Sequence, residues 1–126
     1  MTQLTTLSCP SNQLTTLNLT SLVNLTTLNC AYNQLTTLDL SNLDNLTTLN
    51  CGHNQIASLD LTNLTNLSQV NCESNLISNA FILNNMPDLN SMYCQNNLIP
   101  SITFNETPNL EVLDCSANKI NSLNLM

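Results

Sequence analysis

Six segments of the chain repeat one pattern at a fixed spacing, and this period restricts the fold more than any single residue does. Three successive segments read LTTLSCPSNQLTTLNLTSLVN, LTTLNCAYNQLTTLDLSNLDN and LTTLNCGHNQIASLDLTNLTN. A fixed period of this length is typical of a solenoid, in which each repeat forms one coil that stacks on the next. We therefore expect one solenoid domain with repeats 4–24, 25–45, 46–66, 67–88 and 89–109, followed by a partial repeat 110–126.

Within each repeat, numbered from its first leucine, apolar residues occupy positions 1, 4, 6, 11, 14, 16 and 19. The pairs at positions 4 and 6 and at positions 14 and 16 have the two-residue spacing of a half-buried strand. No segment sustains the 3.6-residue period of an amphipathic helix. The pattern predicts an all-β solenoid of about six coils, with two short strands per coil, two parallel sheets and little or no α-helix.

An asparagine stands at position 9 of every repeat, between the two expected strands. Since the chain has a single glycine, Gly52, we expect these asparagines to turn the backbone, because asparagine tolerates left-handed conformations. Facing inward at one height, they would also satisfy backbone groups that the turn leaves unpaired. This ladder is predicted to be structural, with a ligand-contacting row as the alternative; its members are Asn12, Asn33, Asn54, Asn75, Asn97 and Asn118.

A cysteine stands at position 6 of every repeat, where an apolar inward-facing side chain is expected. We predict a column of buried free thiols with a packing role. Disulfides and a thiolate metal site are the alternatives, but a linear column cannot surround one ion tetrahedrally, so we predict no metal and no cofactor. The six residues are Cys9, Cys30, Cys51, Cys72, Cys94 and Cys115.

The fourth repeat is irregular, because it is one residue longer than its neighbours. The apolar residues from Phe81 onward keep the spacing of the earlier repeats, so the extra residue is placed in the stretch 76–80. We predict a bulge there.

The run LxxLxCxxNxL, present as Leu25, Leu28, Cys30, Asn33 and Leu35, resembles the leucine-rich-repeat signature. Six copies in register, each with a second LxxLxL half, are similar to the short bacterial-type class of that family. The resemblance implies a right-handed superhelix with a sheet on one face, a role in protein recognition and no catalytic machinery. Because coils this short leave no room for helices on the convex side, we expect slight curvature.

The net negative charge of the chain argues against nucleic acids and anionic membranes as partners. Eight acidic residues against one lysine, Lys119, and no arginine give a net charge of -7. Nucleic acids and anionic membrane surfaces require clustered cations, so neither is expected as a partner. No apolar run approaches the roughly 20 residues that span a bilayer, and no signal peptide is visible at the N-terminus. We expect an extracellular or bacterial-surface location within a longer precursor, with a cytoplasmic location as the alternative.

The outward positions of the first strand form the face on which a partner would bind. We predict Tyr93, Glu73 and Gln95 as the first contacts, because tyrosine is frequent in binding hot spots. The same face carries Asn29, Asn50 and Asn71, with Tyr32 and His53 at position 8 nearby. A protein partner is expected, or else a glycan; the alternative is a solvated face without a ligand.

Catalysis has little support in the sequence. His53, the single histidine, has no registered nucleophile beside it. Asp39 and Asp60 occupy equivalent positions in adjacent coils, where paired carboxylates would serve acid–base chemistry or calcium binding, or would simply be solvated. We predict that the protein is not an enzyme.

Neither end of the chain carries a recognisable capping unit. The repeat begins in register at Leu4 and stops at Met126. An uncovered apolar coil with a bare sheet edge can pair with another chain. We therefore weigh two possibilities: a piece of a larger surface protein, and a structural subunit that associates end to end into an oligomer or filament.

Overall fold

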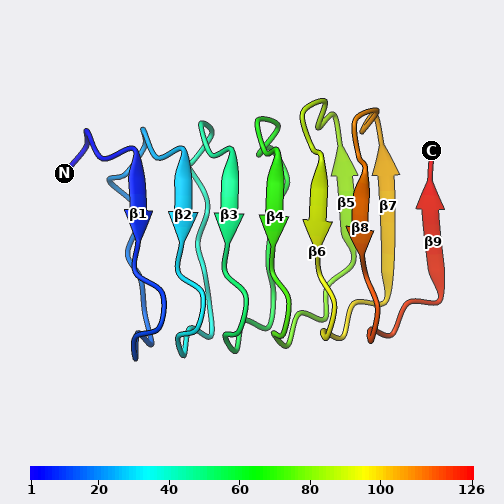
Figure 1. The fold of residues 1–126 in the computed structure, drawn as a ribbon, viewed down its shortest axis with the longest axis horizontal. Coiled ribbons are helices and arrows are strands. Elements are labelled where there is room, and N and C mark those ends of the chain that lie inside the picture. The colour runs from blue at the N-terminus through cyan, green and yellow to red at the C-terminus, as the bar shows by residue number, and fades with distance from the viewer.

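The computed structural model describes residues 1–126 as a right-handed parallel β-solenoid of about six coils without a helix (Figure 1). Strands of the first sheet lie along one side of the molecule and run in one direction, and those of the second sheet lie behind them and run in the other. The rod is nearly straight (Figure 1). The predicted fold class, with two parallel sheets and no helix, is confirmed.

The first sheet contains one short strand from every coil. Its six strands are paired in parallel in the order β1 (Thr6–Ser8), β2 (Thr27–Asn29), β3 (Thr48–Asn50), β4 (Gln69–Asn71), β6 (Ser91–Tyr93) and β8 (Val112–Asp114). The register places equivalent residues side by side, as in Leu28 opposite Leu49 and Asn29 opposite Asn50. Each outward position therefore forms a straight row along the rod, one residue per coil.

The second sheet is present only in the last three coils, so the prediction of two strands in every coil is wrong for coils one to three. Its strands are β5 (Phe81–Asn84), β7 (Ser101–Asn105) and β9 (Ser122–Leu125). In coils one to three, position 15 is Asn18, Asp39 or Asp60, and each side-chain oxygen accepts a hydrogen bond from the backbone N–H two residues later. Such local bonds compete with a strand ladder.

The corresponding residues in the next two coils, Ile82 and Thr103, lie within strands. Both are β-branched, and branching at Cβ favours the extended conformation. The sixth coil departs from this pattern, because its equivalent residue, Asn124, lies within β9. The residue type at this position therefore accompanies the difference in the first five coils but does not decide it alone.

The extra residue of the fourth repeat lies between Ser78 and Phe81, inside the stretch 76–80. There the carboxamide of Asn79 bonds to both backbone groups of Leu59 in the preceding coil: its oxygen accepts from the N–H at 3.1 Å and its amide donates to the carbonyl at 3.1 Å. At this point the side chain of Asn79, and not a backbone group, forms the hydrogen bonds to the preceding coil. The ladder resumes when Phe81 starts β5.

One continuous apolar column fills the space between the two sides. Its 29 buried residues extend from Leu19 in the first coil to Phe104 in the fifth, so no boundary interrupts the core. Leucines of the first coil and of the last, such as Leu7 and Leu113, pack against the column but are only partly buried. The structure holds no helix of the length and apolarity that crossing a membrane requires.

The residue that turns the backbone is the one before each ladder asparagine. Position 8 has a positive φ in every coil, between 50° and 56°, in Ser11, Tyr32, His53, Ser74, Asn96 and Ala117. None of the position-9 asparagines has a positive φ, so the prediction that they adopt the left-handed conformation is wrong. Gly52, at position 7, does not adopt it either. The asparagine at position 9 directs its side chain inward from a backbone without positive φ. The chain therefore turns at position 8, the residue before it.

Candidate functional site

The position-9 asparagines connect each coil to the one before it. The amide of Asn54 donates to the carbonyls of Cys51 in its own coil and Cys30 in the preceding coil, at 3.0 and 3.1 Å, and its oxygen accepts from the N–H of Leu35 at 3.0 Å. Asn75 repeats these contacts one coil later. The side chains in the middle of the rod are buried, so they satisfy backbone groups that water cannot reach.

A second asparagine ladder, at position 21 of the repeat, was missed by the sequence-based predictions. The amides of Asn45, Asn66 and Asn109 donate to carbonyls of the preceding coil at 2.7–3.2 Å, and Asn24 donates to the carbonyl of Thr2, just before the first coil, at 2.8 Å. Its members are exposed. The signal in the sequence was the asparagine that ends most repeats, just before the first leucine of the next.

The cysteines form a column along the end of the first sheet, and all six are free thiols. The sheet ladder continues through them, for example from the N–H of Cys30 to the carbonyl of Asn50. Burial raises the pKa of the Cys30 and Cys94 thiols to about 12 and that of Cys51 and Cys72 still further. Neutral buried thiols pack as small apolar side chains and are poor nucleophiles.

Two aromatic side chains predicted as contacts lie against each other at the edge of the first sheet. The rings of Tyr32 and His53 are stacked, with 4.2 Å between centroids and 8° between planes. Both are exposed enough to meet a partner: the Tyr32 residue is 55% exposed and the His53 side chain 37%. Equivalent positions in adjacent coils, one strand spacing apart, bring them together.

Glu73, at position 7 of the fourth coil, lies beside this pair. Its Oε1 lies 3.6 Å from Nε2 of His53 and accepts a hydrogen bond from the amide of Asn71 at 3.2 Å, while its Oε2 accepts from the amide of Gln95. The side chain is 27% exposed. The side-chain oxygen Oε1 of Gln95 is buried without a partner.

The single glycine makes room for this carboxylate. A Cβ on Gly52 would lie 3.2 Å from Cγ of Glu73 and 3.2 Å from Oδ1 of Asn71. Both contacts are tight for a methyl group. The absence of a side chain at residue 52 thus lets Glu73 lie over the backbone of the coil before it.

The structure brings together five of the predicted contacts, Tyr32, His53, Asn71, Glu73 and Gln95. Asn29 and Asn50 lie on the same sheet, but each side-chain oxygen accepts the backbone N–H two residues later, at 3.2 Å. Tyr93 replaces that asparagine in the fifth coil and is 37% exposed. We call these eight residues the recognition face: Tyr32, His53, Glu73, Gln95, Tyr93, Asn29, Asn50 and Asn71.

The two carboxylates considered for acid–base or calcium chemistry act on their own backbone. Asp39 accepts from the N–H of Ser41 and Asp60 from that of Thr62, each at 2.9 Å. Hydrogen bonds from the Ser41 and Thr62 side chains and backbone lower the pKa of these carboxyls. No group of three or more His, Cys, Asp or Glu side chains is placed to hold a metal ion.

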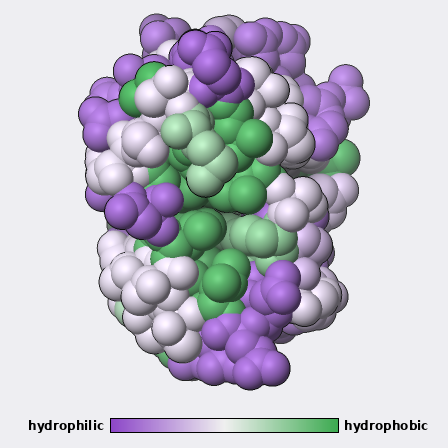
Figure 2. All heavy atoms as spheres, turned by 90° about the vertical axis from the view of Figure 1, so that its left-hand side faces the viewer, coloured by the Kyte–Doolittle hydropathy of each residue, from purple (hydrophilic) through white to green (hydrophobic).

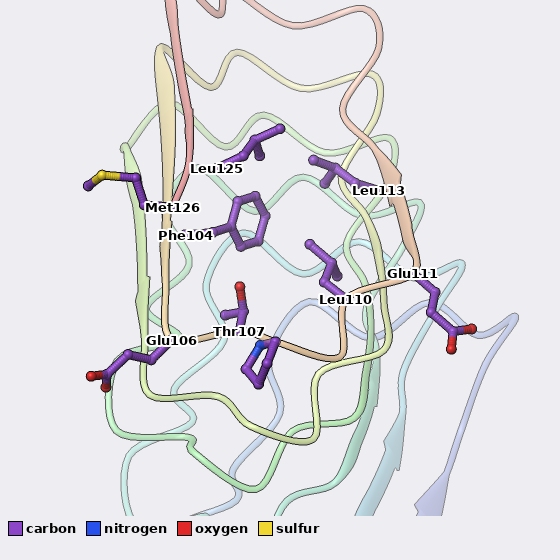
Figure 3. A pocket seen from close by; sticks show the side chains of 9 residues that line it. Phe104, Glu106, Thr107, Leu110, Glu111, Leu113, Leu125 and Met126 are labelled. Atoms are coloured by element: carbon purple, nitrogen blue, oxygen red, sulfur yellow. The ribbon is translucent and has the colours of Figure 1, made fainter.

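Both ends of the rod expose apolar side chains. At the N-terminal end, apolar residues gather in the centre and polar residues surround them (Figure 2). At the C-terminal end, Phe104, Leu110, Leu113 and Leu125 line a hollow, with Glu106 and Glu111 at its sides (Figure 3).

Solved structures of two bacterial proteins are similar to this chain. One is the functional domain of InlJ from Listeria monocytogenes, which includes a cysteine ladder; it shares 36% sequence identity with a TM-score of 0.69 over 94% of this chain. The other is the leucine-rich-repeat protein LIC12759 of Leptospira interrogans, with 27% identity and a TM-score of 0.75 over 98% of this chain.

The chain spans only about a third of each of these structures, 31% of the first and 37% of the second. No protein-family model and no curated protein matches it. The similarity to both structures nevertheless covers nearly the whole chain, and the short coil, the parallel sheets and the repeated LxxLxCxxNxL run agree with it. The chain is a leucine-rich-repeat protein of the short bacterial type.

Proposed function

We propose that the protein is a non-catalytic interaction module that binds a protein partner through the recognition face. The observation that carries this proposal is the stacked pair Tyr32 and His53, two large exposed side chains kept on left-handed backbone. The fold is that of a repeat module, a class commonly used for protein interaction, and the recognition face is the contact surface.

The backbone conformation of Tyr32 and His53 supports a role for their side chains other than stabilising the fold. A positive φ is unfavourable for bulky residues, and a residue held in that region costs on the order of 1–3 kcal/mol. Asparagine tolerates the conformation better and occupies the same position at residue 96. Aromatic residues at 32 and 53 break a local preference, and such violations are expected at functional sites.

The neighbours of His53 favour binding over catalysis. The ring contacts the Tyr32 ring and the Glu73 carboxylate, and neither is a nucleophile activated by the imidazole. An exposed tyrosine with a fixed polar rim is instead the composition of a binding hot spot.

The proposal is tested by capture on immobilised protein, followed by identification of the bound partner. Tyr32→Asn and Tyr93→Ala should each abolish or strongly reduce capture. Thr103→Ala, on the second sheet, is the matched control and should leave it unchanged. Equal capture by the three variants and the unaltered protein would overturn the recognition face as the binding surface.

A second candidate function is end-to-end association of the chain, favoured by the apolar hollow at one end and the apolar centre of the other. Size-exclusion chromatography with light scattering over a range of concentrations tests it. Association should increase with concentration and be reduced by Leu125→Glu, which charges the hollow. Ile82→Glu, equally apolar and exposed but on the side of the rod, should have no effect. A concentration-independent monomer excludes this function.

A further inference from the structure

The recognition face carries negative charge that no cation of the chain balances. Glu73 lies on it, and Asp114 follows in the sixth coil on the same sheet. Lys119 is the single lysine and the chain has no arginine. The only ion pair is the one between His53 and Glu73, at 3.6 Å, and it is an ion pair only when the imidazole is protonated.

Glu73 is held in place before a partner arrives. Amide donors from Asn71 and Gln95 fix both carboxylate oxygens, and Gly52 provides the space beneath. Amides orient the group without neutralising it, so the charge remains available. A partly buried, oriented carboxylate binds an incoming cation more strongly than a freely rotating exposed one, because less conformational freedom is lost.

The Tyr32 ring is a second group on this face that favours a cationic partner. His53 covers one face of the ring. The equivalent residue on the other side is Ser11, whose side chain is small, and Tyr32 remains 55% exposed. Cations, arginine above all, are attracted to the face of an aromatic ring.

Tyr32 and Glu73 belong to coils two apart. At about 4.8 Å per coil they are separated by roughly 10 Å along the rod, which is close to one turn, or three residues, of a polyproline II helix. Side chains three residues apart in that conformation point the same way, so two cationic side chains can reach both groups.

We propose that the partner presents a basic segment, in which one arginine stacks on Tyr32 and a second cationic side chain pairs with Glu73. This rests on the proposed function and names the chemistry of the partner. The net charge of -7 attracts such a segment from a distance, and the two fixed groups select its spacing.

Calorimetric titration with synthetic peptides tests the inference. A peptide with Arg-Ser-Ser-Arg at its centre should bind saturably, and one with Glu-Ser-Ser-Glu should not. Glu73→Gln and Tyr32→Asn should each weaken binding of the arginine peptide by about fivefold to tenfold. Asp44→Asn removes the same charge from an exposed position elsewhere and should change affinity less than about twofold.

Three results would overturn the inference: no binding of the arginine peptide, equal binding of the glutamate peptide, or equal losses from Glu73→Gln and Asp44→Asn, which would mean general charge attraction. The proposed function is tested separately from this inference. If Tyr32→Asn abolishes capture of a protein partner while the arginine peptide does not bind, the recognition face stands and the basic partner is wrong.

Discussion

The ring of Tyr32 lies flat on the ring of His53, 4.2 Å away, although both residues adopt a left-handed backbone with φ of 55°. Stacking of aromatic rings contributes about 0.5–1.5 kcal/mol, which offsets part of the cost of that conformation. The pair is therefore tolerated by the fold but not required by it.

Replacement of Tyr32 by asparagine should separate stability from binding. Asparagine suits a positive φ, and the gain should cancel most of the lost stacking, so the free energy of unfolding should change by less than about 1 kcal/mol. Binding to the recognition face should be lost. Urea denaturation and the capture assay measure the two effects, and a large loss of stability would show that the pair is structural.

Removal of a ladder asparagine should be costly in the middle of the rod and mild at its end. Asn75→Ala leaves the buried N–H of Ile56 without a partner. It also removes one of the two amide donors to each of the Cys51 and Cys72 carbonyls, which keep Asn54 and Asn97, and should destabilise by about 1–3 kcal/mol. Asn12→Ala, at an exposed position that bonds only within its own coil, should cost under about 1 kcal/mol. Equal urea midpoints for the two variants would contradict the structural role of the ladder.

Acid should destabilise the protein partly through Asp60. Its pKa is lowered in the folded chain by hydrogen bonds from Thr62, so its stabilising contribution is present above the pKa of the unfolded chain and is lost as pH falls through the folded value. Asp60→Asn keeps an acceptor there, as Asn18 does in the first coil. The variant should therefore lose less stability than the unaltered protein between pH 7 and pH 3, as measured by urea midpoints.

Alkali should destabilise the protein through the cysteine column. The pKa of Cys30 and Cys94 is raised to about 12 by burial, so these thiols stay neutral in the folded chain while unfolded thiols ionise near pH 9. Their stabilising contribution is complete below pH 9 and declines as pH rises from there towards 12, by about 1.4 kcal/mol per pH unit for each thiol. Cys30→Val should reduce the slope of unfolding free energy against pH, and an unchanged slope would exclude this cause.

The repeat pattern alone was enough to specify the solenoid, the position of its first sheet and the composition of its core. A strict period places equivalent residues on one row, and an apolar residue at every inward position leaves one way to bury them. The same logic located the irregularity of the fourth repeat, because the apolar spacing resumes at Phe81.

The number of strands in the second sheet also had a signal in the sequence, which the apolar spacing concealed. In the second to fifth coils the apolar residues at positions 14 and 16 are buried whether or not the backbone between them pairs. In the second to fourth coils the residue between them carries this signal: Asp39 and Asp60 bond locally, whereas Ile82 favours an extended strand. In the sixth coil Asn124 lies within β9, so the signal does not extend to every coil.

How the candidate contacts combine became clear only from the three-dimensional arrangement. Tyr32, His53 and Glu73 come from three successive repeats, and their types do not reveal that two rings stack and a carboxylate pairs beside them. Nor does the sequence show that the turn falls on position 8 rather than on the asparagine after it. The period of the repeat sets which residues are neighbours, but the direction of each side chain depends on the backbone angles of the turn, and these are set by the contacts between coils.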